Sequence, residues 1–126
     1  MSENESSSCN KPGQFSWNEL VTTDIEGATA FYTHLLGWTT TSFGPDYTLF
    51  NKEDKNAGGM MKVPQPGMPA QWVAYICVED VDATAAKAVE LGGRVMAPPF
   101  DVPSIGRIAV LIDPQGATIG VFKPQA

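Results

Sequence analysis

The chain has 126 residues, a formal net charge of −6 and 43% hydrophobic residues. This length and apolar content suit one globular domain, or two small halves that share a core. The acidic balance disfavours nucleic acid as a partner, and no apolar run approaches the ~18 residues of a membrane-spanning helix.

The first 13 residues are mostly polar and predict a disordered tail, which leaves a single domain over residues 14–126. The tail lacks the charged start and the apolar segment of a signal peptide. We therefore expect a cytoplasmic protein.

The first half of the domain, residues 14–63, begins with a strand pattern and a helix pattern. Within residues 15–23, a period of two places Phe15, Trp17 and Val21 on one face, together with Glu19, which predicts a strand. Asp24 is a typical N-cap for a helix over residues 25–36, and Gly37 is a typical stop. The remaining predicted strands of this half cover residues 38–42, 47–50 and 57–63, with a charged loop over 51–56.

A second half, residues 70–124, follows a segment with three prolines, residues 64–69. This segment cannot form a helix or a central strand and is predicted to be a linker. The second half starts with a strand over 72–78 and a helix that runs to Leu91, capped by Asp80 or Asp82. It continues with a short strand over 94–97, which Pro98-Pro99 breaks, and an irregular stretch over 100–104. It ends with a hairpin over 105–123.

The two halves repeat one order of elements, strand, helix, strand, strand, strand. Ala-Thr-Ala occurs at residues 28–30 and again at 83–85, and Gly-x-x-Lys occurs at 59–62 and again at 120–123. The alignment of the two first strands is uncertain by one residue. Such a repeat predicts two supersecondary units that bury a face against each other.

Four motifs of the sequence point to a known family. They are Trp17-Asn18-Glu19-Leu20 before Asp24, Ala30-Phe31-Tyr32 with Leu35-Leu36-Gly37-Trp38, Val78-Glu79-Asp80-Val81-Asp82 before Leu91-Gly92-Gly93, and Asp113-Pro114-Gln115-Gly116. In these motifs, residues 14–124 resemble the vicinal oxygen chelate superfamily, or glyoxalase/bleomycin resistance/dioxygenase fold. The resemblance implies an α+β fold of two βαβββ modules, residues 14–63 and 70–124. Their strands would form a curved, U-shaped mixed sheet with helices on its outer face and a concave site inside.

The resemblance also implies where a metal would bind. In metal-using members, four ligands, usually His, Glu or Gln, come from the first and last strands of each module. The matching positions here are Trp17, Val73 (or Trp72 in the other alignment), Gly59 and Gly120, and none of them can ligate a cation through its side chain. We therefore expect no metal.

The remaining candidate donors do not form a set. The one histidine, His34, falls on the first predicted helix, where we expect it to lie near the helix end and outside the sheet. Glu19 and Cys77 are two isolated donors on strands. No GxGxxG motif or P-loop occurs, so no cofactor is expected.

Strand parity predicts which side chains share the concave face with those ligand positions. They are Trp17, Glu19, Val21, Gly59, Met61, Val73, Tyr75, Cys77, Gly120 and Phe122. The two glycines would leave room beneath a ligand, and the aromatic rings would form flat walls. Such a pocket suits a small, partly aromatic molecule.

Glu19 and Tyr75 are the candidates for chemistry on this face. Glu19 would hold a cationic ligand or act as a base. Alternatively, it reaches the rim, packs at a dimer contact, or pairs with Arg94 or Arg107. Tyr75 has packing as its alternative role.

The two cysteines lie in different settings, Cys9 in the polar tail and Cys77 in an apolar strand. We therefore expect no disulfide between them, and we interpret Cys77 as a small buried hydrophobe and not as a nucleophile.

Together these features predict metal-free binding of a small organic ligand in the concave sheet. The alternative is a lyase or isomerase that acts on a small carbonyl compound through Glu19 or Tyr75. A metal-dependent glyoxalase or dioxygenase is disfavoured by the ligand positions. Because members of the fold commonly dimerise and open sheet edges favour pairing, we expect a homodimer.

Overall fold

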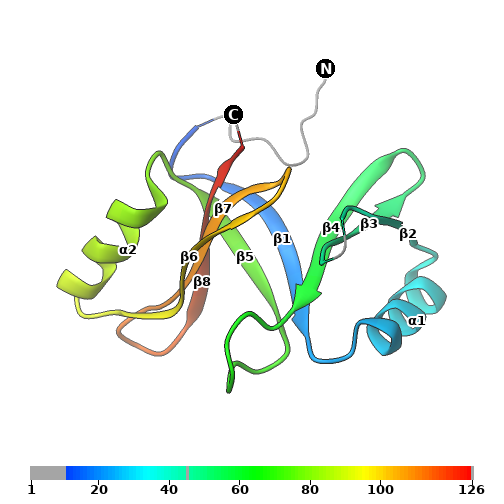
Figure 1. Cartoon of the computed structure of the whole chain (residues 1–126), viewed down its shortest axis with the longest axis horizontal. Helices are drawn as coiled ribbons and strands as arrows, with labels where there is room; N and C mark the ends of the chain where they lie inside the picture. Colours follow the sequence, from blue (N-terminus) through cyan, green and yellow to red (C-terminus); the bar gives the residue numbers. More distant parts are fainter. Residues whose placement is uncertain (1–10, 45, 126) are drawn as a thin grey trace. The chain divides into compact units, whose positions relative to one another are not determined.

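The structure is a computed structural model that describes residues 11–44 and 46–125. This part of the chain contains two helices and eight strands, in the order β-α-β-β-β twice over (Figure 1). The α+β class and the two predicted βαβββ modules are confirmed. The predicted tail lies outside the described residues except for residues 11–13.

The elements group into two compact units. One unit comprises residues 18–72, and the other comprises the described residues up to Trp17 together with those from Val73 onward. The first five elements are β1 (Phe15–Thr22), α1 (Ile25–Leu36), β2 (Thr39–Ser42), β3 (Thr48–Lys52) and β4 (Lys55–Lys62). The last five are β5 (Gln71–Cys77), α2 (Val81–Glu90), β6 (Arg94–Val102), β7 (Gly106–Ile112) and β8 (Thr118–Pro124). Residues 64–69 form neither helix nor strand.

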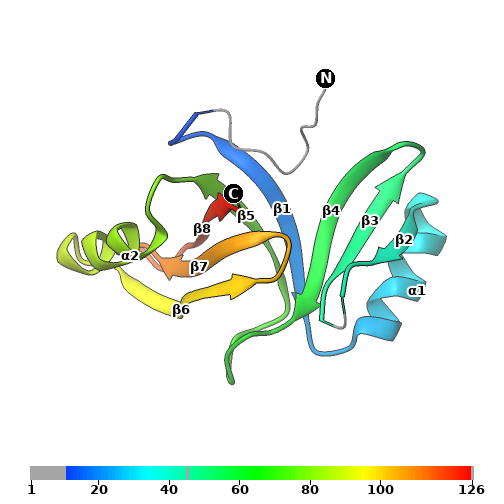
Figure 2. The same ribbon diagram turned by 45° about the horizontal axis from the view of Figure 1, so that its top comes forward.

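The unit of residues 18–72 is a four-stranded sheet with one helix beside it (Figure 2). The strand order is β2-β3-β4-β1, in which β1 and β4 are parallel and the other pairs are antiparallel. Leu20, Phe50 and Met60 form the buried core on one face, and Ala28 and Tyr32 of α1 pack against them. Because side chains alternate along a strand, Glu19 and Val21 belong to the opposite face.

The ends of α1 are those that the sequence predicts. The side chain of Asp24 accepts a hydrogen bond from the backbone N–H of Gly27 at 2.9 Å, and Gly37 ends the helix with a φ of 71°. His34 is exposed in the last turn, and its Nδ1 lies 2.8 Å from the carbonyl oxygen of Ala30.

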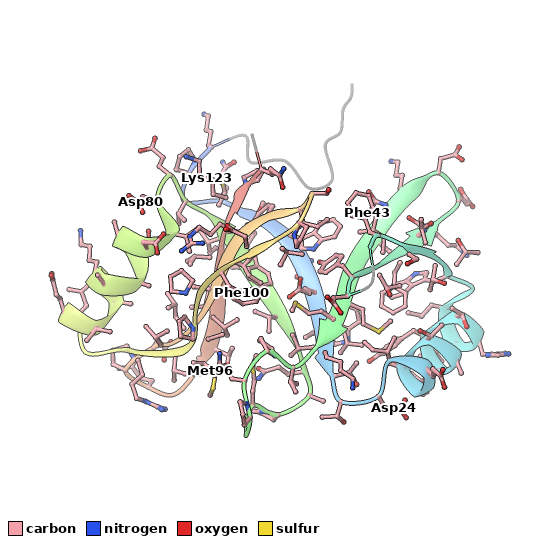
Figure 3. All side chains as sticks on the ribbon, viewed as in Figure 1. Asp24, Phe43, Asp80, Met96, Phe100 and Lys123 are labelled. Atoms are coloured by element: carbon pink, nitrogen blue, oxygen red, sulfur yellow. The ribbon has the colours of Figure 1, made fainter. Side chains whose placement is uncertain are left out.

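In the other unit α2 covers a sheet of order β5-β8-β7-β6. The buried cluster beneath α2 consists of Val81, Ala85, Ala109, Leu111 and Val121. Asp80, not Asp82, is the N-cap, because its carboxylate accepts from the backbone N–H of Ala83 at 2.9 Å. Figure 3 labels Asp80 at the start of α2 and its counterpart Asp24 ahead of α1.

The prediction for residues 94–104 is wrong. Strand β6 does not stop at Ala97 but continues through Pro98-Pro99 to Val102. Its register with β7 shifts on both sides of Ala97. These irregularities and the edge position of β6 accommodate two residues that lack an N–H, because an edge strand has one side without ladder hydrogen bonds.

The predicted charged loop over residues 51–56 is also shorter than expected. Strand β3 extends to Lys52 and β4 starts at Lys55, which leaves a two-residue turn. Glu53 adopts a φ of 57° in this turn, a conformation in which Gly or Asn is usual. Because neither residue type stands at this position, the short turn was not predicted.

Neither described helix is long and apolar enough to cross a membrane.

Candidate functional site

A buried carboxylate is the main polar feature of the sheet face opposite α1. Glu19 on β1 is 1% exposed, and Tyr47, which directly precedes β3, is 3% exposed. The hydroxyl of Tyr47 donates a hydrogen bond to Oε2 of Glu19 at 2.6 Å. This length is typical of a hydroxyl that donates to an ionised carboxylate.

Gly59 makes the position of Tyr47 possible. It is the register partner of Glu19 in the parallel pair of β1 and β4. A Cβ atom at Gly59 would collide with the hydroxyl and ring of Tyr47. The tyrosine therefore occupies the space that a side chain at residue 59 would take.

The other unit repeats this arrangement with Tyr75 and Gly120. These two residues are register partners in the parallel pair of β5 and β8. A Cβ atom at Gly120 would collide with the ring of Tyr75, which is 1% exposed. Each unit thus places a tyrosine ring over a glycine of its last strand.

The predicted ligand-binding residues divide between the two units. Residues 18–72 contribute Glu19, Val21, Gly59 and Met61, and the register pairs Val21 with Met61. The other unit contributes Trp17, Val73, Tyr75, Cys77, Gly120 and Phe122, and the register pairs Cys77 with Phe122. The set as a ligand-binding surface stays a prediction.

Two details of the site differ from the sequence analysis. The glycines do not leave open space, because tyrosines of the same chain fill it. Tyr47, which directly precedes β3, was also not among the predicted site residues. Only the fold brings it to Glu19, which lies 28 positions earlier.

Arg107, one of the predicted alternatives for pairing with Glu19, has its ion pairs elsewhere. Its Nε and Nη2 donate to the two carboxylate oxygens of Asp82 at 2.8 and 2.9 Å, and its Nη1 donates to Asp101 at 3.1 Å. The hydrogen bonds from Arg107 lower the pKa of Asp82, and the two carboxylates raise the pKa of Arg107. Arg94, the other alternative, is exposed at the start of β6.

Cys77 takes part in a disulfide, which contradicts the prediction of a buried free thiol. The chain contains one other cysteine, Cys9, which lies outside the described residues. The physical reason is visible next to Cys77. Its carbonyl accepts from the N–H of Gly13 at 2.7 Å and its N–H donates to the carbonyl of Gln14 at 2.9 Å, so the N-terminal segment runs alongside it.

The residues at the expected ligand positions do not fit a metal. Trp17 and Val73 are apolar, and a donor side chain at Gly59 or Gly120 would need the space that a tyrosine fills. The sulfur of Cys77 is bonded in the disulfide. Across residues 11–44 and 46–125, no group of three or more His, Cys, Asp or Glu side chains is placed to hold a metal ion.

Comparison with known proteins gives both sequence and structural relatives. The chain is 47% identical over 119 residues to the putative glyoxylase CFP32 of Mycobacterium bovis, covering 91% of this chain and 46% of that protein. It is 33% identical over 130 residues to the anthracycline biosynthesis protein DnrV of Streptomyces peucetius, covering 89% of this chain and 47% of the relative. The chain thus spans about half the length of these curated relatives.

Among solved structures, homoprotocatechuate 2,3-dioxygenase of Brevibacterium fuscum superposes with a TM-score of 0.60 at 21% identity. The match covers 95% of this chain and 39% of the dioxygenase and shows a shared fold. Residues 14–121 match the sequence profile of the family, and the chain therefore belongs to the Glyoxalase/Bleomycin resistance protein/Dioxygenase superfamily.

Proposed function

We propose that this chain binds a small organic molecule, without a metal, on the sheet face that carries Glu19. The observation that carries the proposal is the hydrogen bond between two buried side chains, Glu19 and Tyr47. Burying a carboxylate is costly, so such groups concentrate where proteins bind ligands or perform chemistry.

Tyr47 gives the ligand a route to this carboxylate. It directly precedes β3, where its backbone carbonyl accepts from the N–H of Phe43 at 2.8 Å. Sheet hydrogen bonds are made by the backbone, so the side chain can move without breaking them. A ligand that donates a hydrogen bond or carries a positive charge would replace the hydroxyl at Glu19 and take the space above Gly59. The neighbouring Val21 and Met61 suit an apolar part of the ligand.

The relatives support a ring-bearing or carbonyl-bearing ligand. One is named for anthracycline biosynthesis and another as a putative glyoxylase. The alternative of a lyase or isomerase that uses Glu19 or Tyr75 stays a prediction.

A thermal-shift screen in EDTA with cationic, neutral and anionic ring compounds tests the proposal. A ligand that binds only the native state raises Tm by mass action. We expect cationic hits with the unmodified protein, and a smaller rise in Glu19→Gln, which keeps an acceptor for Tyr47 but loses the charge. The control is Glu79→Gln, an exposed carboxylate before α2. Equal shifts in all three proteins, or hits that appear only when the screen is repeated with a divalent metal in place of EDTA, would overturn the proposal.

The chain is also proposed to form a homodimer. Both units expose large apolar side chains, with Leu35 of α1 61% exposed and Leu91 after α2 69% exposed. Strand β2 is exposed along its whole length and offers an open sheet edge. Light scattering after size exclusion should give twice the mass of one 13.5 kDa chain, and a mass of 13.5 kDa would refute the proposal.

A cytoplasmic location stays a prediction, and the disulfide at Cys77 argues against it. Cytosolic reductants keep most thiols reduced. Alkylating the protein at the moment of cell lysis shows the state of Cys77: a modified thiol supports the prediction, and an unmodified Cys77 contradicts it.

A further inference from the structure

The unit of residues 18–72 contains a hollow of about 420 Å³ beside the start of α1. Its lining comes from the end of β1, from α1 and from the chain around the start of β5, and includes Thr22, Asp24, Phe31, Tyr32, Gln71 and Trp72. Leu20 also lines it. Because side chains alternate along β1, the hollow lies on the other side of this strand from Glu19. It is thus separate from the site proposed above.

Three aromatic rings form one wall of the hollow. Phe31 and Tyr32 meet edge to face, with ring centroids 4.9 Å apart, and Tyr32 and Trp72 do the same at 5.5 Å. The indole N–H of Trp72 donates a hydrogen bond to the hydroxyl oxygen of Tyr32 at 3.0 Å, which holds the two rings together. The wall is open to a ligand, since Phe31 is 58% and Trp72 39% exposed.

The described lining of the hollow contains one charged side chain, and it is acidic. Among the described residues that line it, Asp24 is a carboxylate and none is a lysine or arginine. Oδ1 of Asp24 caps α1 through the N–H of Gly27. Lys62 is the register partner of Thr22 but is not part of the lining.

We propose that this hollow is a binding site for a small aromatic cation. The ring of the ligand would lie against Trp72 and Phe31, and its ammonium group would approach Asp24. Electron-rich ring faces and a carboxylate attract the same charge, so both features select a cation. The volume exceeds the roughly 150 Å³ of an engineered cavity that holds one benzene, which leaves room for a two-ring compound.

Three indole compounds of one shape separate charge from ring binding. They are tryptamine, which is cationic at pH 7, tryptophol, which is neutral, and indole-3-propionate, which is anionic. Titrated into ¹⁵N-labelled protein, tryptamine should shift the indole N–H signal of Trp72 and the amide signal of Gly27 until both saturate. Tryptophol should bind about fivefold more weakly, and indole-3-propionate more weakly still.

Two variants and a matched control test whether Asp24 selects the cation and whether Phe31 contacts the ring of the ligand. Asp24→Asn keeps a good N-cap but removes the carboxylate, so the preference for tryptamine over tryptophol should fall from about fivefold to about twofold, the part that the ring faces supply. Asp80→Asn makes the same change at the N-cap of α2 and should leave the preference intact. Phe31→Ala, at an exposed position, should weaken all three compounds by about fivefold.

The contrary outcomes separate the existence of the site from the role of Asp24. Absence of saturable shifts at Trp72 and Gly27 would overturn the site. An unchanged preference in Asp24→Asn, or the same loss in Asp80→Asn, would overturn the role of Asp24 in selecting a cation.

Discussion

Replacing Tyr47 by phenylalanine removes one hydroxyl from the Glu19 site and leaves the ring in place. The ring continues to fill the space above Gly59, so no cavity forms. What disappears is the 2.6 Å hydrogen bond to Oε2 of Glu19. The substitution therefore removes this buried polar interaction and keeps the ring in place.

The magnitude follows from burial. Glu19 is 1% exposed and Tyr47 is 3% exposed, so water has little access to replace the hydroxyl at the carboxylate oxygen. Hydrogen bonds to charged groups contribute about 1.5–3 kcal/mol, and we expect the free energy of unfolding to fall by about 2 kcal/mol. For a chain of this length, that corresponds to a drop in Tm of about 8 °C.

Urea denaturation of four proteins measures the effect: the unmodified protein, Tyr47→Phe, Glu19→Gln and the double variant. The double-mutant cycle should give a coupling of at least about 1 kcal/mol between the two residues. Tyr32→Phe is the matched control. It removes a hydroxyl bonded to Trp72 at a more exposed position and should cost about 0.5–1 kcal/mol.

The reasoning is refuted if Tyr47→Phe costs no more than Tyr32→Phe, because the hydroxyl would then not stabilise the buried carboxylate. Because Gln keeps an acceptor for Tyr47, a coupling of zero with Glu19→Gln would mean that the charge of Glu19 does not strengthen the hydrogen bond.

Three further substitutions test other parts of the structure. Gly59→Ala puts a methyl group into the buried hydroxyl and ring of Tyr47, so urea denaturation should show a loss of about 1–3 kcal/mol. No loss would show that the ring moves freely. Arg107→Gln should raise the pKa of Asp82 toward its ordinary value, as followed by NMR titration of the carboxyl group. Since that pKa is lowered in the folded protein, the ion pair stabilises above about pH 4 and is lost as the pH falls through the folded value. An unchanged titration would contradict this. Gly37→Ala forces a side chain into the left-handed region at the end of α1 and should cost about 1 kcal/mol, and a neutral result would show that the helix end rearranges.

Local signals explain why much of the fold was predictable. The bounds of α1 follow from Asp24, a 3.6-residue apolar period and Gly37, all within one stretch of chain. Strand parity, counted from the ligand positions that the family resemblance implies, likewise placed Glu19 on the face of its register partner Gly59. The helix bounds depend on neighbours in sequence, and the shared face depends on parity together with the known plan of the family.

The prediction failed where a segment distant in sequence determines the environment of a residue. Two adjacent prolines normally end a strand, yet in β6 they lie at a sheet edge where a missing N–H is tolerated. Cys77 sits in an apolar strand, which predicts a free thiol, but backbone pairing with residues 13 and 14 brings the N-terminal segment to it.

The sequence by itself determined the α+β class, the repeated module, the position of the carboxylate and the poor match of the expected ligand positions to a metal. The class, the modules and the carboxylate rest on periodicity, caps and the internal repeat, and the ligand positions rest on the family resemblance together with residue chemistry. Only the tertiary structure decided which side chain fills the space above Gly59 and which hydroxyl donates to Glu19. Tyr47 has both roles. It reaches Glu19 and Gly59 only because β1 and β3 both pair with β4, and these strands are far apart in the sequence.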